Sequence, residues 1–132
     1  MLFSNNLTAQ NTLQINNSDD KEIVEMLKTF YKEYITENDK MPLNELKISI
    51  IKKKYCTKKL LEKIAKDDLD YDPLVNAQDI SQYYLKTMKI TKEPKKTNTF
   101  QVCFTNEYNK KPFCVKLLII NTKEGFKIDT IY

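Results

Sequence analysis

The sequence predicts an α+β fold, in which N-terminal helices pack on an antiparallel sheet of about four strands. Apolar residues recur at helical spacing as far as about residue 66, and they alternate with polar residues beyond about residue 86. A segment with five aspartates, residues 67–79, separates the two halves. Helices followed by a run of strands are typical of α+β domains.

Residues 19–132 are expected to form a single domain, because a chain of 132 residues with 41% apolar residues can bury one core. Residues 1–18 are expected to be a disordered leader. Its small Ala9 before Gln10 resembles the end of a secretory signal peptide, of which this segment would be the remnant. That interpretation places the protein in the bacterial periplasm or outside the cell. The alternative is a plain disordered leader on a cytoplasmic protein.

The composition excludes several classes of function. The net charge of +4 comes from 22 lysines, with no arginine and no histidine in the chain. The planar guanidinium group of arginine forms paired hydrogen bonds to guanine edges, so its absence disfavours specific nucleic-acid recognition. The lysine runs are interpreted as a solvated face. Without histidine there is no serine-histidine or cysteine-histidine catalysis and no imidazole metal site. No cofactor is expected.

The first helix is expected over residues 20–36. Asp19 is its expected N-cap, with Glu22 three residues later in a variant of the capping box. Its apolar stripe repeats at helical spacing and is widened by further apolar positions: Ile23, Val24, Leu27, Phe30, Tyr31, Tyr34 and Ile35. The two tyrosines are expected at the edge of the core.

Two more helices are expected before the acidic segment. The second covers residues 43–55 and places Leu43, Leu46, Ile50 and Ile51 at helical spacing. Thr57 then caps a short third helix that carries Leu60, Leu61 and Ile64. Cys56 lies in the bend between them, and a small buried apolar residue is the preferred interpretation over a reactive thiol.

The second half predicts an antiparallel meander. Residues 80–85 are expected to form a helical turn, with Asn76 and Asp79 as its caps, followed by a strand over residues 86–90. Further strands are expected over residues 100–104, 113–120 and 126–131. The most apolar of these, residues 113–120, is expected to be central. Gly125, the only glycine, marks the last turn.

The alternation fixes a register for the hairpin. Three pairs place every apolar partner on one face: Phe100 with Leu117, Val102 with Val115, and Phe104 with Phe113. The same register places Cys103 opposite Cys114, where Cβ atoms lie about 4.5–5.5 Å apart at a non-hydrogen-bonded site. We expect a cross-strand disulfide. Two unbridged cysteines in contact fit the sequence equally well in a reducing compartment.

The acidic segment has three interpretations. Asp68, Asp70, Asp72 and Asp79 follow EF-hand spacing, but Pro73 stands where that loop needs a glycine, which leaves these aspartates as weak candidates for a cation. Closely spaced carboxylates also suit a general base, yet no convergent set of catalytic roles accompanies them. The preferred interpretation is a loop braced by a turn at Asp72–Pro73.

The segments Tyr55-Cys56-Thr57, Leu60-Leu61, Leu69-Asp70-Tyr71-Asp72-Pro73 and Ala77-Gln78-Asp79 resemble an uncharacterised family of small secreted bacterial domains. The resemblance covers about residues 23–132. It implies a nuclear-transport-factor-2-like, or cystatin-like, fold in which a curved sheet wraps on helices into a cone with a pocket. It also implies a lipoprotein or periplasmic setting. It implies no catalytic mechanism.

We therefore expect a non-catalytic extracytoplasmic binding domain, and one concrete version is an immunity protein that neutralises a secreted bacterial toxin by direct binding. The candidate contact residues are Tyr55, Asp70, Tyr71, Asp72, Gln78 and Asp79. The alternative is a small-ligand carrier or an enzyme that uses the cone pocket with an aspartate base. The expected partner is another protein, a toxin or a component of the cell envelope, or a small molecule. A membrane is expected only if the full precursor is lipid-anchored, and the chain is expected to be a monomer or dimer.

Overall fold

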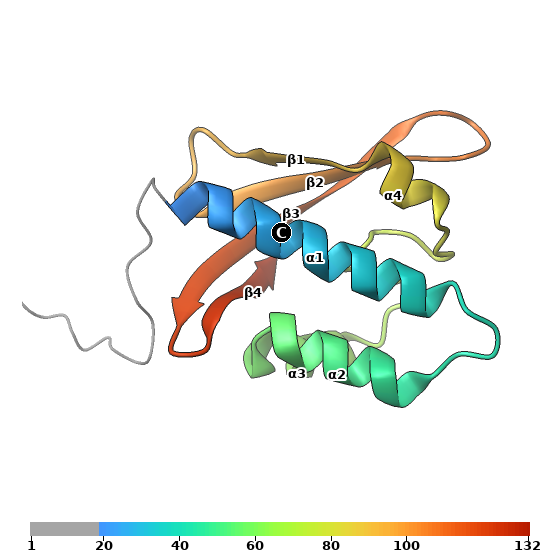
Figure 1. Ribbon diagram of the computed structural model, residues 1–132, viewed down its shortest axis with the longest axis horizontal. Helices are drawn as coiled ribbons and strands as arrows, with labels where there is room; N and C mark the ends of the chain where they lie inside the picture. Colours follow the sequence, from blue (N-terminus) through green and yellow to red (C-terminus); the bar gives the residue numbers. More distant parts are fainter. Residues whose placement is uncertain (1–18) are drawn as a thin grey trace, which may run out of the picture.

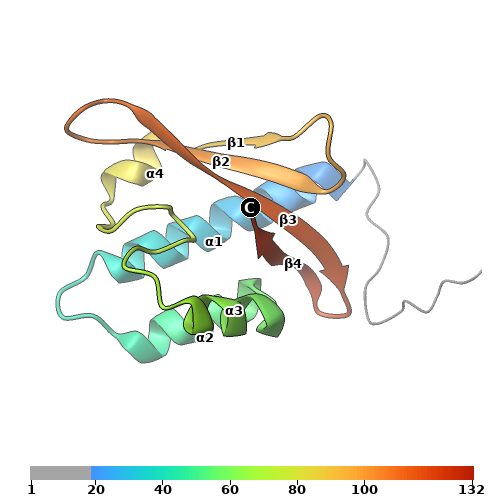
Figure 2. The same cartoon turned by 180° about the vertical axis from the view of Figure 1, so that it is seen from behind.

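A four-stranded antiparallel sheet with helices against one face makes up the architecture in the computed structural model, which describes residues 19–132. Helix α1 lies across the sheet, and helices α2 and α3 lie beside it (Figure 1). Seen from behind, strands β1 to β3 lie in front of α1 (Figure 2). The predicted α+β class, with helices followed by a sheet of four strands, is confirmed. Among these residues no helix is long and apolar enough to cross a membrane.

The elements follow one another in two groups, helices first and strands second. The helices are α1 (Asp20–Asn38), α2 (Glu45–Tyr55), α3 (Lys58–Asp67) and α4 (Tyr83–Thr87). The strands are β1 (Lys89–Lys92), β2 (Thr99–Thr105), β3 (Pro112–Thr122) and β4 (Gly125–Ile131).

The strands are ordered β1-β2-β3-β4, so the most apolar strand, β3, lies inside the sheet as predicted. The β2–β3 register is the predicted one, with Cys103 opposite Cys114. Since side chains alternate along a strand, one face carries the buried residues Phe100, Val102, Phe104, Val115, Leu117, Ile119 and Ile128. A register shift between Leu118 and Ile119 interrupts the β3–β4 pairing. Gly125 has a φ of +108°, a conformation that suits glycine in this turn.

Helix α1 forms the centre of the core. Its stripe is buried as predicted except for Val24, which is half-buried. Tyr31 and Tyr34 lie inside the core rather than at its edge. The expected capping box does not form, because the backbone of Asp19 is already helical (φ −84°, ψ −10°) and its side chain makes no cap hydrogen bond. A side-chain cap needs an extended backbone at that position.

Helix α2 buries a different stripe from the one its spacing indicated. It begins at Glu45, where the Asn44 side chain accepts a hydrogen bond from the Lys47 amide at 3.1 Å. Three of the expected apolar positions are exposed, namely Leu43, Leu46 and Ile50. The inward positions are Ile48, Ile51 and Tyr55. Both sets satisfy helical spacing, so periodicity alone does not choose between them.

The bend between α2 and α3 joins the helices to the sheet. Thr57 caps α3 as predicted, with its Oγ1 accepting from the Leu60 amide at 3.2 Å. The Thr57 amide also donates to the Ile128 carbonyl at 2.9 Å, and Cys56 forms an isolated parallel bridge with Ile128. Cys56 is buried, and burial raises the pKa of its thiol to about 12. The interpretation of Cys56 as a small buried residue is confirmed.

The segment around α4 begins later than expected. The helix covers Tyr83–Thr87 rather than residues 80–85, and β1 covers Lys89–Lys92 rather than residues 86–90. The Ser81 Oγ accepts a hydrogen bond from the Tyr83 amide at 3.1 Å in the turn just before the helix. Asn76 and Asp79 were expected as caps, and that expectation is wrong because the residue at the N-cap position is Gln82, which makes no side-chain cap hydrogen bond. The expected leader, residues 1–18, lies outside the described residues.

Candidate functional site

The acidic segment is a loop closed on itself and anchored in the core. Asp72 and Ala77 form an antiparallel bridge, in which the Asp72 amide donates to the Ala77 carbonyl at 2.9 Å. The turn between them sends the side chains of Leu74 and Val75 into the hydrophobic core, where both are fully buried. The loop therefore has buried anchors at its centre, as expected of a braced loop.

Two tyrosines of α1 hold this loop from the inside. The Tyr31 hydroxyl donates to the Leu74 carbonyl at 2.7 Å, and the Tyr34 hydroxyl donates to Asp72 Oδ2. The other carboxylate oxygen of Asp72 accepts from the Leu74 amide at 2.9 Å. Both oxygens of Asp72 are thus used within the fold, which makes Asp72 a brace of the loop.

Burial keeps these two phenols protonated. It raises the pKa of both Tyr31 and Tyr34 above the usual value of 10, and the negative charge of Asp72 adds to the rise for each. A phenol that stays neutral remains a hydrogen-bond donor across the physiological pH range. The two bonds from α1 to the loop are therefore constant features of the folded protein at neutral pH.

The six predicted contact residues do not form one surface. Asp70, Tyr71, Gln78 and Asp79 are exposed on the loop. Tyr55 is buried at the end of α2, and its hydroxyl donates to Glu33 Oε2 at 2.9 Å. Tyr55 and Asp72 hold the fold together, whereas the other four residues are accessible to a partner.

A second surface element beside the loop was missed by sequence reasoning. A groove of about 640 Å³ separates residues 76–81 from the tip of the β2–β3 hairpin. Gln78 and Asp79 line one side, and Tyr108, whose side chain is 89% exposed, lines the other. The tip is ordered by Asn106, whose Oδ1 accepts from the amides of Tyr108 and Asn109 at 2.9 and 3.0 Å. The asparagine at the start of a tight turn was the available signal.

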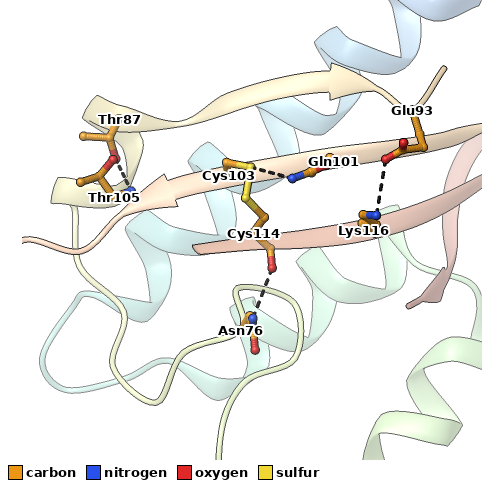
Figure 3. Close-up of a disulfide and its surroundings, with 8 residues drawn as sticks. All are labelled: Asn76, Thr87, Glu93, Gln101, Cys103, Thr105, Cys114 and Lys116. Atoms are coloured by element: carbon orange, nitrogen blue, oxygen red, sulfur yellow. Dashed lines mark hydrogen bonds and ion pairs between the residues drawn. A yellow bond between two sulfur atoms is a disulfide. The ribbon is translucent and has the colours of Figure 1, made fainter. Parts of the chain in front are cut away.

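The loop is also tied to the sheet near the disulfide. Cys103 and Cys114 are joined by an S–S bond, on the face of the sheet opposite the buried side chains (Figure 3). The Asn76 side chain donates to the Cys114 carbonyl at 3.2 Å, and Tyr84 at the start of α4 donates its hydroxyl to the Asp79 carbonyl at 3.1 Å. Both ends of the exposed stretch of residues 76–79 are therefore fixed.

On the opposite side of the loop, a cavity of about 510 Å³ lies between α1, α2 and α3. Its polar lining includes Tyr34, Lys52 and Asp72. This cavity could hold a small molecule of mixed polarity. It is separate from the groove at the hairpin tip, since the two share no lining residue.

The aspartates that were weak candidates for a cation site do not converge. Asp68 ends α3 with a left-handed backbone (φ 47°), and Asp72 is bonded to Tyr34. Within residues 19–132 no group of three or more histidine, cysteine, aspartate or glutamate side chains is placed to hold a metal ion.

No protein-family model matches the chain. No curated protein matches it either. One solved structure is similar, that of a protein of unknown function from Bacteroides thetaiotaomicron, with a TM-score of 0.78 and 24% sequence identity. The match covers 87% of this chain and 92% of that chain. At this identity the likeness shows a shared fold alone, and it is consistent with an uncharacterised family.

Proposed function

We propose that this chain is a non-catalytic binding domain that recognises another protein through the loop of residues 68–81. The observation that carries the proposal is the contrast within this loop. Its interior is fixed by hydrogen bonds from Tyr31 and Tyr34, while Asp70, Tyr71, Gln78 and Asp79 face the solvent. Polar side chains on a loop held by a rigid scaffold are a common arrangement for recognition.

Rigidity matters because a partner then has less chain to order. Immobilising a flexible side chain or loop costs about 0.5–1.5 kcal/mol for each side chain that is ordered on binding. The buried anchors Leu74 and Val75 remove much of this cost before any partner arrives. The exposed Tyr108 across the groove adds a large aromatic contact with few rotatable bonds.

The charge of the loop indicates the kind of partner. Asp68, Asp70 and Asp79 carry negative charge at the surface of the loop, although the whole chain has a net charge of +4. A local acidic patch steers a basic partner surface toward it. In the specific version of the proposal the domain is an immunity protein, in which this loop covers the basic active site of a secreted bacterial toxin.

The proposal includes a setting and a finer description of the fold. The setting is the periplasm or the outside of a bacterial cell, and the fold is a nuclear-transport-factor-2-like cone. Support for the setting comes from the Cys103–Cys114 disulfide, since such bonds persist mainly in oxidising compartments. Support for the cone comes from an antiparallel sheet with helices on one face.

The test removes two surface carboxylates without touching the brace. The wild-type chain and the double variant Asp70→Asn and Asp79→Asn are each immobilised and exposed to the extracytoplasmic fraction of the native cell, and captured proteins are identified. We expect the variant to lose the partner that the wild type retains, with a partner affinity lowered by roughly tenfold or more. Glu124→Gln is the matched control, because Glu124 is an exposed carboxylate outside the loop. Equal affinities for all three proteins would contradict the proposal.

The small-ligand alternative is favoured by one observation, the cavity of about 510 Å³ lined in part by Tyr34, Lys52 and Asp72. Under this alternative the protein purified from its own cell carries a small molecule that native mass spectrometry detects. Ala65→Phe, which fills the cavity from α3, would then abolish that extra mass. A wild-type protein with no extra mass would remove this alternative.

A further inference from the structure

The cavity between α1, α2 and α3 contains opposite charges that do not pair with each other. Lys52 of α2 and Asp72 of the loop both line it, and both side chains are half-buried. Within residues 19–132 the Lys52 ammonium makes neither an ion pair nor a hydrogen bond, and the Asp72 carboxylate makes no ion pair. A charge that is partly withdrawn from water is stabilised by an opposite charge beside it. In the described part of the chain, neither of these two charges has one.

The two charges belong to one small region of the molecule. Burial is the main reason that the pKa of the Cys56 thiol is raised to about 12, and two charges also act on this thiol. Lys52 lowers its pKa and Asp72 raises it. Because electrostatic interactions weaken with distance and are screened by salt, Lys52 and Asp72 both lie near Cys56. One small ligand can therefore reach both charges.

Apolar side chains line the same cavity. Ile48 of α2 and Leu61 and Ile64 of α3 are half-buried there. Covering such side chains with an apolar group removes them from water, which is favourable. The cavity volume of about 510 Å³ lies within the range of roughly 300–1,000 Å³ that is usual for small-molecule pockets. The site therefore suits a ligand that has an apolar part as well as charges.

The formal charges of the lining balance, which limits the charge of the ligand. Two lysines, Lys52 and Lys53, stand against two carboxylates, Glu45 and Asp72. Lys53 and Glu45 are exposed to solvent, so water already stabilises them. A simple anion would pair with Lys52 and leave Asp72 without a counter-charge, and a simple cation would do the reverse. A zwitterion supplies a counter-charge to both.

We propose that this cavity binds a free α-amino acid with an aliphatic side chain. The ligand carboxylate pairs with the Lys52 ammonium, and Ser49, three positions earlier on the same face of α2, adds a hydroxyl donor. The ligand ammonium donates to Asp72, whose two oxygens each accept one hydrogen bond within the fold and each keep a further lone pair. The aliphatic side chain covers the apolar lining. The inference rests on the small-ligand alternative, for which it names the ligand class, and it is independent of protein recognition by the loop.

Three ligands of similar shape and different charge test the proposal by isothermal titration calorimetry. L-Leucine carries both charges, isocaproate only the carboxylate, and isoamylamine only the ammonium. We expect L-leucine to bind at least roughly tenfold more tightly than either analogue, because each analogue lacks one set of charged hydrogen bonds. An analogue that binds as tightly as L-leucine would overturn the amino-acid assignment and leave the small-ligand alternative standing. No binding of any of the three at about 10 mM would overturn the site itself.

Two variants locate the ligand and its carboxylate. Lys52→Gln should lower the affinity for L-leucine and isocaproate by roughly tenfold and leave that for isoamylamine unchanged. Lys66→Gln is the matched control, because Lys66 is an exposed lysine of α3 outside the cavity lining, and it should bind like the wild type. Equal affinities of the two variants for L-leucine would contradict the role of Lys52.

Ala65→Phe should abolish binding by filling the cavity, and unchanged binding would overturn the location of the site. Circular dichroism would verify that all three variants fold. The capture experiment with Asp70→Asn and Asp79→Asn does not depend on these results, so the two proposals can fail separately.

Discussion

Tyr31→Phe tests whether the core holds the acidic loop in place. The substitution keeps the ring and removes only the hydroxyl that donates to the Leu74 carbonyl at 2.7 Å. Because Leu74 is buried, its carbonyl would be left without this donor in a region that water does not reach. An unsatisfied buried polar group costs about 1–3 kcal/mol, and we expect the free energy of unfolding to fall by that amount. Urea denaturation with an unchanged m-value is the measurement.

Tyr71→Phe provides the matched control for this prediction. Tyr71 lies in the same loop, but its side chain is exposed and its hydroxyl makes no hydrogen bond within the described residues. Its loss should change the free energy of unfolding by less than about 0.5 kcal/mol. The reasoning is refuted if Tyr31→Phe is no more destabilising than Tyr71→Phe. Hydrogen exchange at the Ala77 amide, which should be faster in Tyr31→Phe, would locate the effect in the loop.

Three further predictions concern stability. Reducing the Cys103–Cys114 disulfide should lower the free energy of unfolding by about 2–3 kcal/mol, and gel mobility should differ with and without reductant; identical mobility would contradict the bond. Burial raises the pKa of the Cys56 thiol to about 12. The contribution of this thiol to the free energy of unfolding is therefore complete below about pH 9 and is lost as the pH rises toward 12. Cys56→Ala should reduce this alkaline loss of stability, measured by denaturation from pH 9 to 10. Asp68 has a left-handed backbone, which glycine adopts without strain. Asp68→Gly should therefore raise the free energy of unfolding by up to about 1 kcal/mol, and the melting temperature with it, whereas Asp70→Gly should not.

The hairpin register was predictable because the sequence constrains it twice. The alternation of Phe100, Val102 and Phe104 assigns one face to the core, and a slip by one residue would expose all three. Cys103 and Cys114 then occupy facing positions on the other side. The burial of Cys56 was also predictable, since the bend in which it lies has to connect two packed helices.

Other features depend on contacts between distant segments and were not predictable from local patterns. Helix α2 has two stripes with acceptable spacing, and only the position of α1 and α3 decides that Ile48 rather than Leu46 packs against the core. The roles of Asp70 and Asp72 differ because Tyr34, in another helix, bonds to Asp72 alone. Tyr108 joins the candidate surface because the hairpin tip and residues 76–81 line the same groove, a proximity that the sequence does not reveal.

The bridge between Cys56 and Ile128 protects one border of the sheet. Strand β4 is an outer strand, and the Thr57 amide occupies the Ile128 carbonyl that would otherwise be open to another chain. At the opposite border, β1 has only four residues and carries lysines at both ends, Lys89 and Lys92. Short, charged or covered outer strands resist the addition of strands from other molecules. The protein can therefore present a sheet with two borders while keeping a low tendency to form β-aggregates.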